Sequence, residues 1–138
     1  MLQRKQSLWM LLAAACAVLT IKLPFSSGPS PSQGKLIEFV TASSYWPLLL
    51  LTVVVVVVTL VNIFNYKNRK LQLRIIIGLI LVSLLDIFLF YQQTTKFLGG
   101  GTIAIWSILA LAIPLLLIMA ARGISKDQKL IKSADRLR

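Results

Sequence analysis

One acidic side chain, Asp86, lies within an otherwise apolar stretch at residues 84–88. An ionisable group inside a membrane helix is unfavourable by at least about 2.5 kcal/mol on insertion scales, and it normally faces protein or a water-filled cavity. Such a carboxyl could relay protons or cations. It could also be a buried structural group that forms hydrogen bonds or stays uncharged. We favour the structural interpretation, because a conduit needs more than one polar group along its path.

Three other polar residues, Lys22, Thr52 and Ser107, lie within apolar stretches and could reach the level of Asp86. The long stem of Lys22 could carry its ammonium group towards Asp86 or out to lipid headgroups, and we favour the headgroups. Thr52 and Ser107 could donate hydrogen bonds to the carboxyl, although polar residues in membrane helices are commonly just packing contacts. These four residues are the candidate intramembrane polar site.

The sequence has few residues suited to catalysis, metal binding or disulfide formation. The chain has no histidine and one cysteine, Cys16, so histidine acid/base catalysis, zinc sites and intrachain disulfides are excluded. The acidic residues Glu38, Asp86, Asp127 and Asp135 are expected at three different levels relative to the membrane. The chain contains no phosphate-binding loop, nucleophile elbow or metalloprotease helix motif. We therefore expect no enzyme, no catalytic residue, no cofactor and no metal.

The composition requires a membrane. Hydrophobic residues make up 57% and charged residues 14% of the chain, whereas soluble domains have roughly 45–50% and about 25%. Stretches near 6–25, 45–64, 73–92 and 102–121 have the length of about 20 residues that crosses a bilayer as a helix. The sequence predicts an all-α integral membrane protein, with a four-helix transmembrane domain at 1–121 and a basic cytoplasmic tail, expected to be helical, at 122–138.

Two of these stretches allow another interpretation. Residues 53–58 are six consecutive valines, which favour a strand in water, but in lipid the backbone must satisfy its own hydrogen bonds and a helix is expected. The first stretch follows Arg4 and Lys5 as in a secretory signal peptide. Because its hydrophobicity continues to Ile21, we expect an uncleaved anchor.

Lys and Arg residues predict the orientation, because they are enriched on the cytoplasmic side of membrane helices. Twelve of the 15 fall on one side. They are Arg4 and Lys5 before the first stretch, Lys67, Arg69, Lys70 and Arg74 between the second and third, and Arg122, Lys126, Lys129, Lys132, Arg136 and Arg138 after the fourth. Lys22, Lys35 and Lys96 fall on the other. We expect a multi-pass protein of the bacterial inner membrane with both termini in the cytoplasm.

The connections on the external side are expected to be loops. Residues 26–44 contain Ser, Gly and Pro near their start and predict a flexible loop, with a short apolar part at 36–40 that could lie on the membrane surface. Ser44 could cap the second helix, with Pro47 in its first turn. Glycines at 99–101 predict a turn, and Thr102 could cap the fourth helix.

The tail carries cations at spacings of three and four residues, which gather them on one face of a helix. They are Arg122, Lys126, Lys129, Lys132 and Arg136, with Arg138 at the end. We expect these residues to contact anionic lipid headgroups, in preference to an acidic protein or RNA. Gly123 could end the fourth helix and let the tail turn along the membrane, and a straight continuation of the helix is the alternative.

Three local patterns resemble one known family: MLQRKQSL at residues 1–8, YKNRKLQLR at 66–74 and KDQKLIKSADRLR at 126–138. They are similar to small four-helix membrane proteins of Bacteroidota that are catalogued as a domain of unknown function. The resemblance covers the whole chain in layout. It implies four helices in the inner membrane and implies no activity.

These observations favour a non-enzymatic membrane subunit or scaffold that packs in a bundle or larger membrane complex and presents a basic tail. Membrane lipid, a membrane protein complex and a second copy of the chain are the expected partners, and nucleic acid is not. The alternative is a small oligomeric transporter or ion conduit that uses Asp86.

Overall fold

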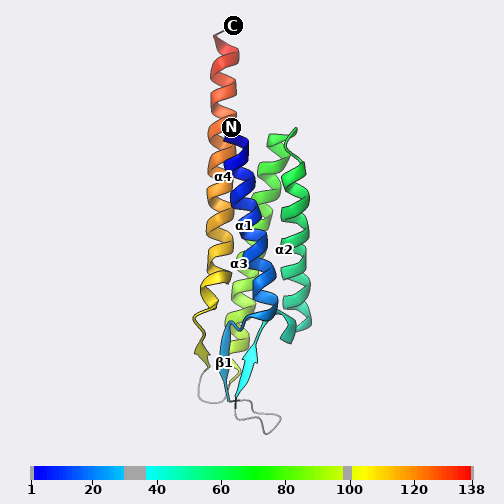
Figure 1. Ribbon diagram of the computed structural model, residues 1–138, viewed down its shortest axis with the longest axis vertical. Helices are drawn as coiled ribbons and strands as arrows, with labels where there is room; N and C mark the ends of the chain where they lie inside the picture. The colour runs from blue at the N-terminus through cyan, green and yellow to red at the C-terminus, as the bar shows by residue number, and fades with distance from the viewer. Residues whose placement is uncertain (1, 30–36, 98–100, 138) are drawn as a thin grey trace.

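Four long helices run side by side in a computed structural model of the chain, which describes residues 2–29, 37–97 and 101–137 (Figure 1). The helices are α1 (Leu2–Lys22), α2 (Trp46–Phe64), α3 (Arg69–Thr95) and α4 (Ser107–Arg136). Each is long and apolar enough to cross a membrane. The chain is therefore an all-α, four-helix membrane bundle, as the sequence predicts.

The helix bounds differ from the apolar stretches mainly where polar turns extend a helix. α2 nearly coincides with the stretch at 45–64, whereas α3 adds a turn at each end and α4 begins later and continues to Arg136. α1 ends at Lys22, because Pro24 follows and a residue before proline disfavours helical geometry. Hydropathy marks only the part of a helix that lies in lipid, so it misses the polar turns.

The buried residues of each helix recur every three or four positions, which is the spacing of helices packed along a seam. In α2 they are Leu48, Thr52, Val55, Thr59 and Asn62. The outward positions between them are apolar and exposed, including several of the consecutive valines. A surface that is more apolar than part of the interior would be unfavourable in water. It indicates that these faces contact lipid.

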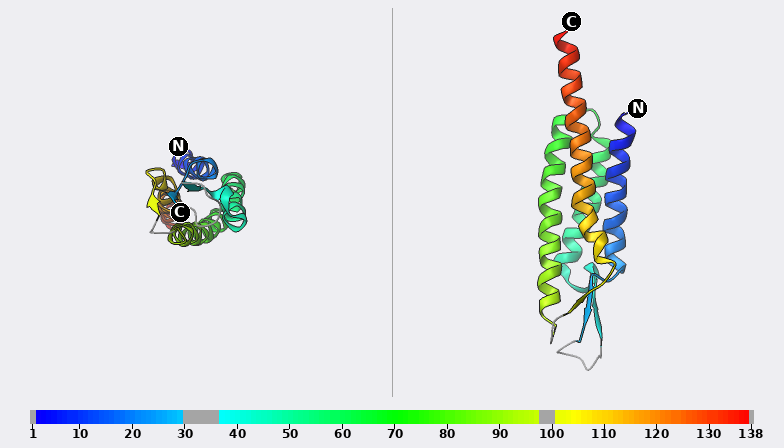
Figure 2. Two further views of the ribbon diagram at one scale, coloured as in Figure 1. Left: turned by 90° about the horizontal axis from the view of Figure 1, so that it is seen from below. Right: turned by 90° about the vertical axis from the view of Figure 1, so that its left-hand side faces the viewer.

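Each helix packs against two neighbours, in the cyclic order α1, α2, α3, α4 (Figure 2). Successive helices run in opposite directions. The start of α1, the connection from α2 to α3 and the last turns of α4 therefore lie at one end of the bundle, here called the terminal end. The opposite end is called the sheet end.

The sheet end carries a small antiparallel sheet where the sequence predicts flexible loops. Strands β1 (Ser26–Gly28), β2 (Glu38–Val40) and β3 (Thr102–Ile103) pair in the order β2-β1-β3. The apolar part of the predicted loop contributes β2 at residues 38–40, so this part is a strand, and its place at the membrane surface stays a prediction. Residues 30–36 and 98–100, which include part of the loop and of the glycine turn, lie outside the described residues.

Both predicted caps at this end are wrong. Ser44 belongs to a short 3-10 helix, η1 (Ala42–Ser44), and Tyr45 is the residue that precedes α2. Pro47 does lie in the first turn of α2. Thr102 is in β3, where its hydroxyl donates to the Ser27 carbonyl at 3.0 Å. The hydroxyl therefore completes a strand pairing and does not begin a helix.

An aromatic cluster joins the sheet to the helices. The rings of Phe25 and Phe90 stack with centroids 4.8 Å apart. Phe97 is buried beside two glycines, and a Cβ atom added at Gly28 would lie 2.6 Å from its ring. A glycine is required there because any side chain would displace the ring. The sheet thus closes this end of the bundle over an apolar core.

Candidate functional site

Asp86 lies on α3 and contacts Thr52 on α2 inside the bundle. The Asp86 side chain is 4% exposed, and its Oδ2 atom is 3.2 Å from the hydroxyl oxygen of Thr52. Thr52 also lies 2.8 Å from the carbonyl oxygen of Leu48. The second carboxyl oxygen, Oδ1, is buried and has no hydrogen-bond partner. The structure therefore brings two of the four predicted polar residues together.

The hydrogen atoms in this group are limited in number. A threonine hydroxyl has one hydrogen, so it donates either to Leu48 or to Asp86 at any moment. The Thr52 hydroxyl is within donating distance of both oxygens. Both contacts can also form together if the Asp86 carboxyl is protonated and its O–H donates to the Thr52 oxygen, while Thr52 donates to Leu48. The geometry accommodates a neutral, hydrogen-bonded carboxyl.

Lys22 and Ser107 do not join Asp86. Lys22 is the last residue of α1 and is exposed. Ser107 is buried and is the first residue of α4. Within the described residues, neither forms an ion pair or a side-chain hydrogen bond with the carboxyl. The four sequence-predicted residues thus form one pair and two separate positions.

An apolar layer separates Asp86 from the terminal end. It consists of Met10, Ala13, Ala17, Val55, Ile76, Leu79, Ile113, Leu117, Ala120 and Ile124. Two hydroxyls near this layer donate to carbonyls of their own helices, Ser83 to Ile80 and Thr59 to Val55. Their hydrogen bonds are local, so they add no polar contact between helices at this level.

Nearer the terminal end, Asn62 and Gln72 link α2 and α3. The amide nitrogen of the Asn62 side chain donates to the backbone carbonyl of Gln72 at 3.2 Å, and the Gln72 side chain donates to the carbonyl of Asn62 at 3.1 Å. Both side chains are buried. This reciprocal pair holds the ends of the two helices across their short connection.

A second polar cluster joins three helices at the terminal end. Gln6 of α1 donates to Asp127 of α4 at 2.5 Å, and Arg69 of α3 lies 3.9 Å from the same carboxylate oxygen. Gly123 makes this possible, because a Cβ there would lie 2.9 Å from the Gln6 side chain. The sequence reasoning missed this cluster. The signal in the sequence is Gly123, which lies one turn before Asp127 on the same helix.

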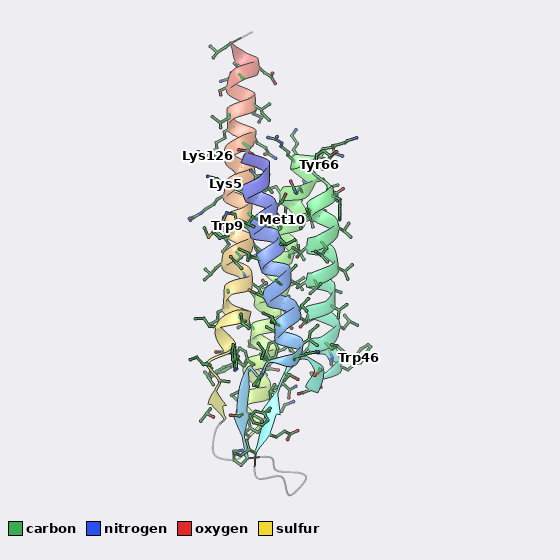
Figure 3. The ribbon with its side chains drawn as sticks, in the orientation of Figure 1. Lys5, Trp9, Met10, Trp46, Tyr66 and Lys126 are labelled. Carbon is green, nitrogen blue, oxygen red and sulfur yellow. The ribbon has the colours of Figure 1, made fainter. Side chains whose placement is uncertain are left out.

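A basic pocket opens beside this cluster, between the start of α3 and α4. Its volume is about 580 Å³. It is lined by Lys67, Asn68, Arg69, Lys70, Leu71, Arg74, Gln128, Ile131 and Lys132. Figure 3 shows Lys5, Tyr66 and Lys126 at this same end, with Trp46 at the other. Charged and aromatic side chains therefore flank the apolar part of the bundle, as in membrane proteins generally.

Comparison with known proteins identifies the family of the chain. A family described as a domain of unknown function, DUF4293, matches residues 2–137. The chain belongs to this family. Neither a curated protein nor a solved structure matches. The match confirms the resemblance to a domain of unknown function that the two termini and the central basic segment indicate, and the bacterial group stays a prediction.

In this DUF4293 protein, α4 continues without a break past the end of the bundle (Figure 1). Gly123 lies inside the helix, so of the two alternatives the straight continuation is the observed one. Residues 129–137, here called the projecting segment, are all exposed. It carries Lys129, Lys132 and Arg136, whereas Arg122 and Lys126 are exposed beside the bundle and Arg138 lies outside the described residues.

Proposed function

We propose that this DUF4293 protein is a non-enzymatic membrane subunit whose projecting segment binds an acidic helix of another protein at the cytoplasmic side. The observation that carries the proposal is the uninterrupted α4, which holds residues 129–137 beyond the bundle. In Figure 2 this segment continues along the bundle and does not turn across its end. A helix held in this direction meets a partner more readily than it meets the membrane surface.

The projecting segment is amphipathic. Leu130, Ala134 and Leu137 recur at spacings of four and three and share a face. Leu130 is 52% and Leu137 is 90% exposed. Lys129, Lys132 and Arg136 lie on the other side at the same spacings. An apolar stripe beside cations suits the apolar face of an acidic helix.

A second copy of the chain fits this face less well. In a parallel pair of projecting segments, the cations of one copy would lie beside the same cations of the other, and Asp135 is the single acid of the segment. Like charges at close range destabilise such pairing. Charge complementarity therefore favours a different, acidic chain.

The alternative function, an oligomeric conduit, would use Asp86. The unpartnered Oδ1 atom is the observation in its favour. Against it, the layer between Asp86 and the terminal end is mainly apolar, and the buried Ser83 and Thr59 hydroxyls near it donate to carbonyls of their own helices. An oligomeric conduit would need a polar path between copies, and the outward faces of the helices carry many exposed apolar side chains. The subunit role is therefore preferred.

Charge supports the cytoplasmic placement of the terminal end. The cations at that end include Lys67, Lys70, Arg74 and Lys126, whereas Lys22 and Lys96 lie at the sheet end. Cytoplasmic sides of membrane helices carry this excess. The projecting segment would then meet cytoplasmic proteins or cytoplasmic parts of membrane proteins.

Site-specific photo-crosslinking in native membranes tests the proposal. A photoreactive residue at Leu130 or Leu137 should crosslink to one protein with an acidic helix, and the same residue at Asp135, which is exposed and lies away from the apolar stripe, should crosslink less. Replacing Lys126, Lys129 and Arg136 with glutamine should weaken the crosslink from Leu137. The proposal fails if the three positions crosslink equally, if only lipid is captured, or if the glutamine variant crosslinks as strongly.

A further inference from the structure

The basic pocket gathers positive charge from two parts of the chain. Lys67, Lys70 and Arg74 come from the α2–α3 connection and the start of α3, and Lys132 comes from α4. Arg69 also lines the pocket but faces Asp127 at 3.9 Å, which offsets part of its charge. Within the described residues that line the pocket there is no acidic side chain. The pocket therefore has a strong positive potential that a bound anion would stabilise.

The side-chain amide of Gln128 has hydrogen-bond donors that no acceptor among the described residues satisfies. Its Nε2 atom is buried and has no partner, although Gln128 lines the pocket. A buried donor left without an acceptor is unfavourable by about 1–3 kcal/mol. The oxygen atoms of an anion are acceptors only, so they complement both this amide and the surrounding cations. The pocket thus has the chemistry of a phosphate site.

Apolar surface runs from the pocket along α3. Arg74, Gly78, Leu81 and Leu85 lie on one face of the helix at spacings of four, three and four. Leu81 is 64% exposed, and apart from its own helix no atom lies within 4 Å of the position that a Cβ would take at Gly78. A headgroup in the pocket would let its acyl chains follow this face. A free inorganic anion would leave the face unused.

We propose that the basic pocket binds the phosphate of an anionic phospholipid from the leaflet at the terminal end. Four cations beyond the Arg69–Asp127 contact suit a headgroup with about two negative charges, as in phosphatidic acid. This binding does not require the proposed partner of the projecting segment, because the two surfaces share only Ile131 and Lys132 near their border. A lipid held there would brace the α2–α3 connection against α4.

Binding of phosphatidic acid to the full-length protein in mild detergent tests the proposal, with native mass spectrometry or calorimetry as the measurement. Replacing Lys70, Arg74 and Lys132 with glutamine should weaken binding at least ~10-fold, since each cation near a membrane surface contributes about 1 kcal/mol. The matched control replaces Lys126, Lys129 and Arg136, which do not line the pocket. Its affinity should stay within about twofold of the original. Equal weakening by both triple variants would show a general charge effect and overturn the pocket.

The source of the phosphate needs its own comparison. Phosphatidylcholine should not bind, and inorganic phosphate at the same concentration should not displace phosphatidic acid. Displacement by inorganic phosphate would overturn the lipid assignment.

A single uncharged change keeps the proposal testable if the triple variant does not fold. Gln128→Leu removes the buried donor and should weaken binding by roughly tenfold without changing the net charge. Unchanged affinity in folded Gln128→Leu protein would contradict the role given to this amide. In the photo-crosslinking experiment the Gln128→Leu variant, which keeps every cation of the projecting segment, should retain the Leu137 crosslink, so failure of one proposal is distinguishable from failure of the other.

Discussion

The two ends of the bundle are held together by different kinds of contact. At the sheet end, stacked rings and neutral hydroxyls close the core, and the Thr94 hydroxyl donates to Ser26 at 2.8 Å within it. At the terminal end, amides and charges join the helices, and a pocket and a free helix remain open. One end is closed by the sheet over a packed core, and the other leaves a pocket and the projecting segment exposed.

Burial explains why the ends differ in this way. The aromatic cluster is removed from solvent on all sides, so area and packing supply its stability. The contact of Arg69 with Asp127 is weaker, because the arginine side chain is 26% exposed and the charges are 3.9 Å apart. Substitutions at the sheet end should therefore affect folding most, and substitutions at the terminal end should affect binding most.

The largest expected difference between the ends is accessibility from outside the cell, which is all or none. In a Cys16→Ala background, a cysteine at Ser43 on the sheet end should react with a membrane-impermeant maleimide in intact spheroplasts. A cysteine at Asn68 on the terminal end should react only after the membrane is permeabilised, because the excess of Lys and Arg at this end favours a cytoplasmic position. Both positions are exposed in the structure. Labelling of Asn68→Cys alone in intact spheroplasts would invert the orientation.

The next largest effect is expected at the aromatic cluster. Phe90 is 1% exposed and stacks on Phe25, so Phe90→Ala should lower the free energy of unfolding by about 3–5 kcal/mol. Phe88 is on the same helix but faces outward at 54% exposure, which makes Phe88→Ala the matched control. Thermal unfolding in detergent measures both. Equal losses would show that Phe90 does not stabilise the sheet end through the cluster.

A smaller loss is expected at the terminal end. Asp127→Leu leaves the buried Gln6 amide without its acceptor and removes the carboxylate facing Arg69, which should destabilise the bundle by about 1–3 kcal/mol. Asp135→Leu removes the same charge from the exposed projecting segment and should change stability little. A variant at Asp127 as stable as the one at Asp135 would indicate that the cluster does not hold the three helices together.

Sequence reasoning predicts the four helices because their signal is local and strong. Long apolar runs must form helices in lipid whatever their strand propensity, so even the six valines are helical. The sheet escapes prediction because its strands have two or three residues, and the pairing of Ser26 with Ile103 joins distant segments. The cluster of Gln6, Arg69 and Asp127 escapes for the same reason. No periodic pattern identifies which of many polar residues will meet at a helix end.

The smallest effect is expected at Asp86, between the two ends. Asp86→Asn preserves the size of the side chain and an oxygen for hydrogen bonding, and it removes any charge. If the carboxyl is neutral and structural, the variant should unfold in detergent at an unchanged or slightly higher temperature, because no buried charge is lost. If the carboxylate were charged and stabilised by the Lys22 ammonium, the variant would be less stable, and Lys22→Met would restore stability.

We expect the neutral outcome, since Lys22 is exposed and no ion pair joins it to Asp86 in the described part of the chain. A relay would instead keep stability and lose pH-driven flux in liposomes, so measuring both quantities on the same variant separates the three roles. Marked destabilisation of Asp86→Asn that the double variant reverses would overturn the neutral interpretation and make the buried charge pair part of the fold.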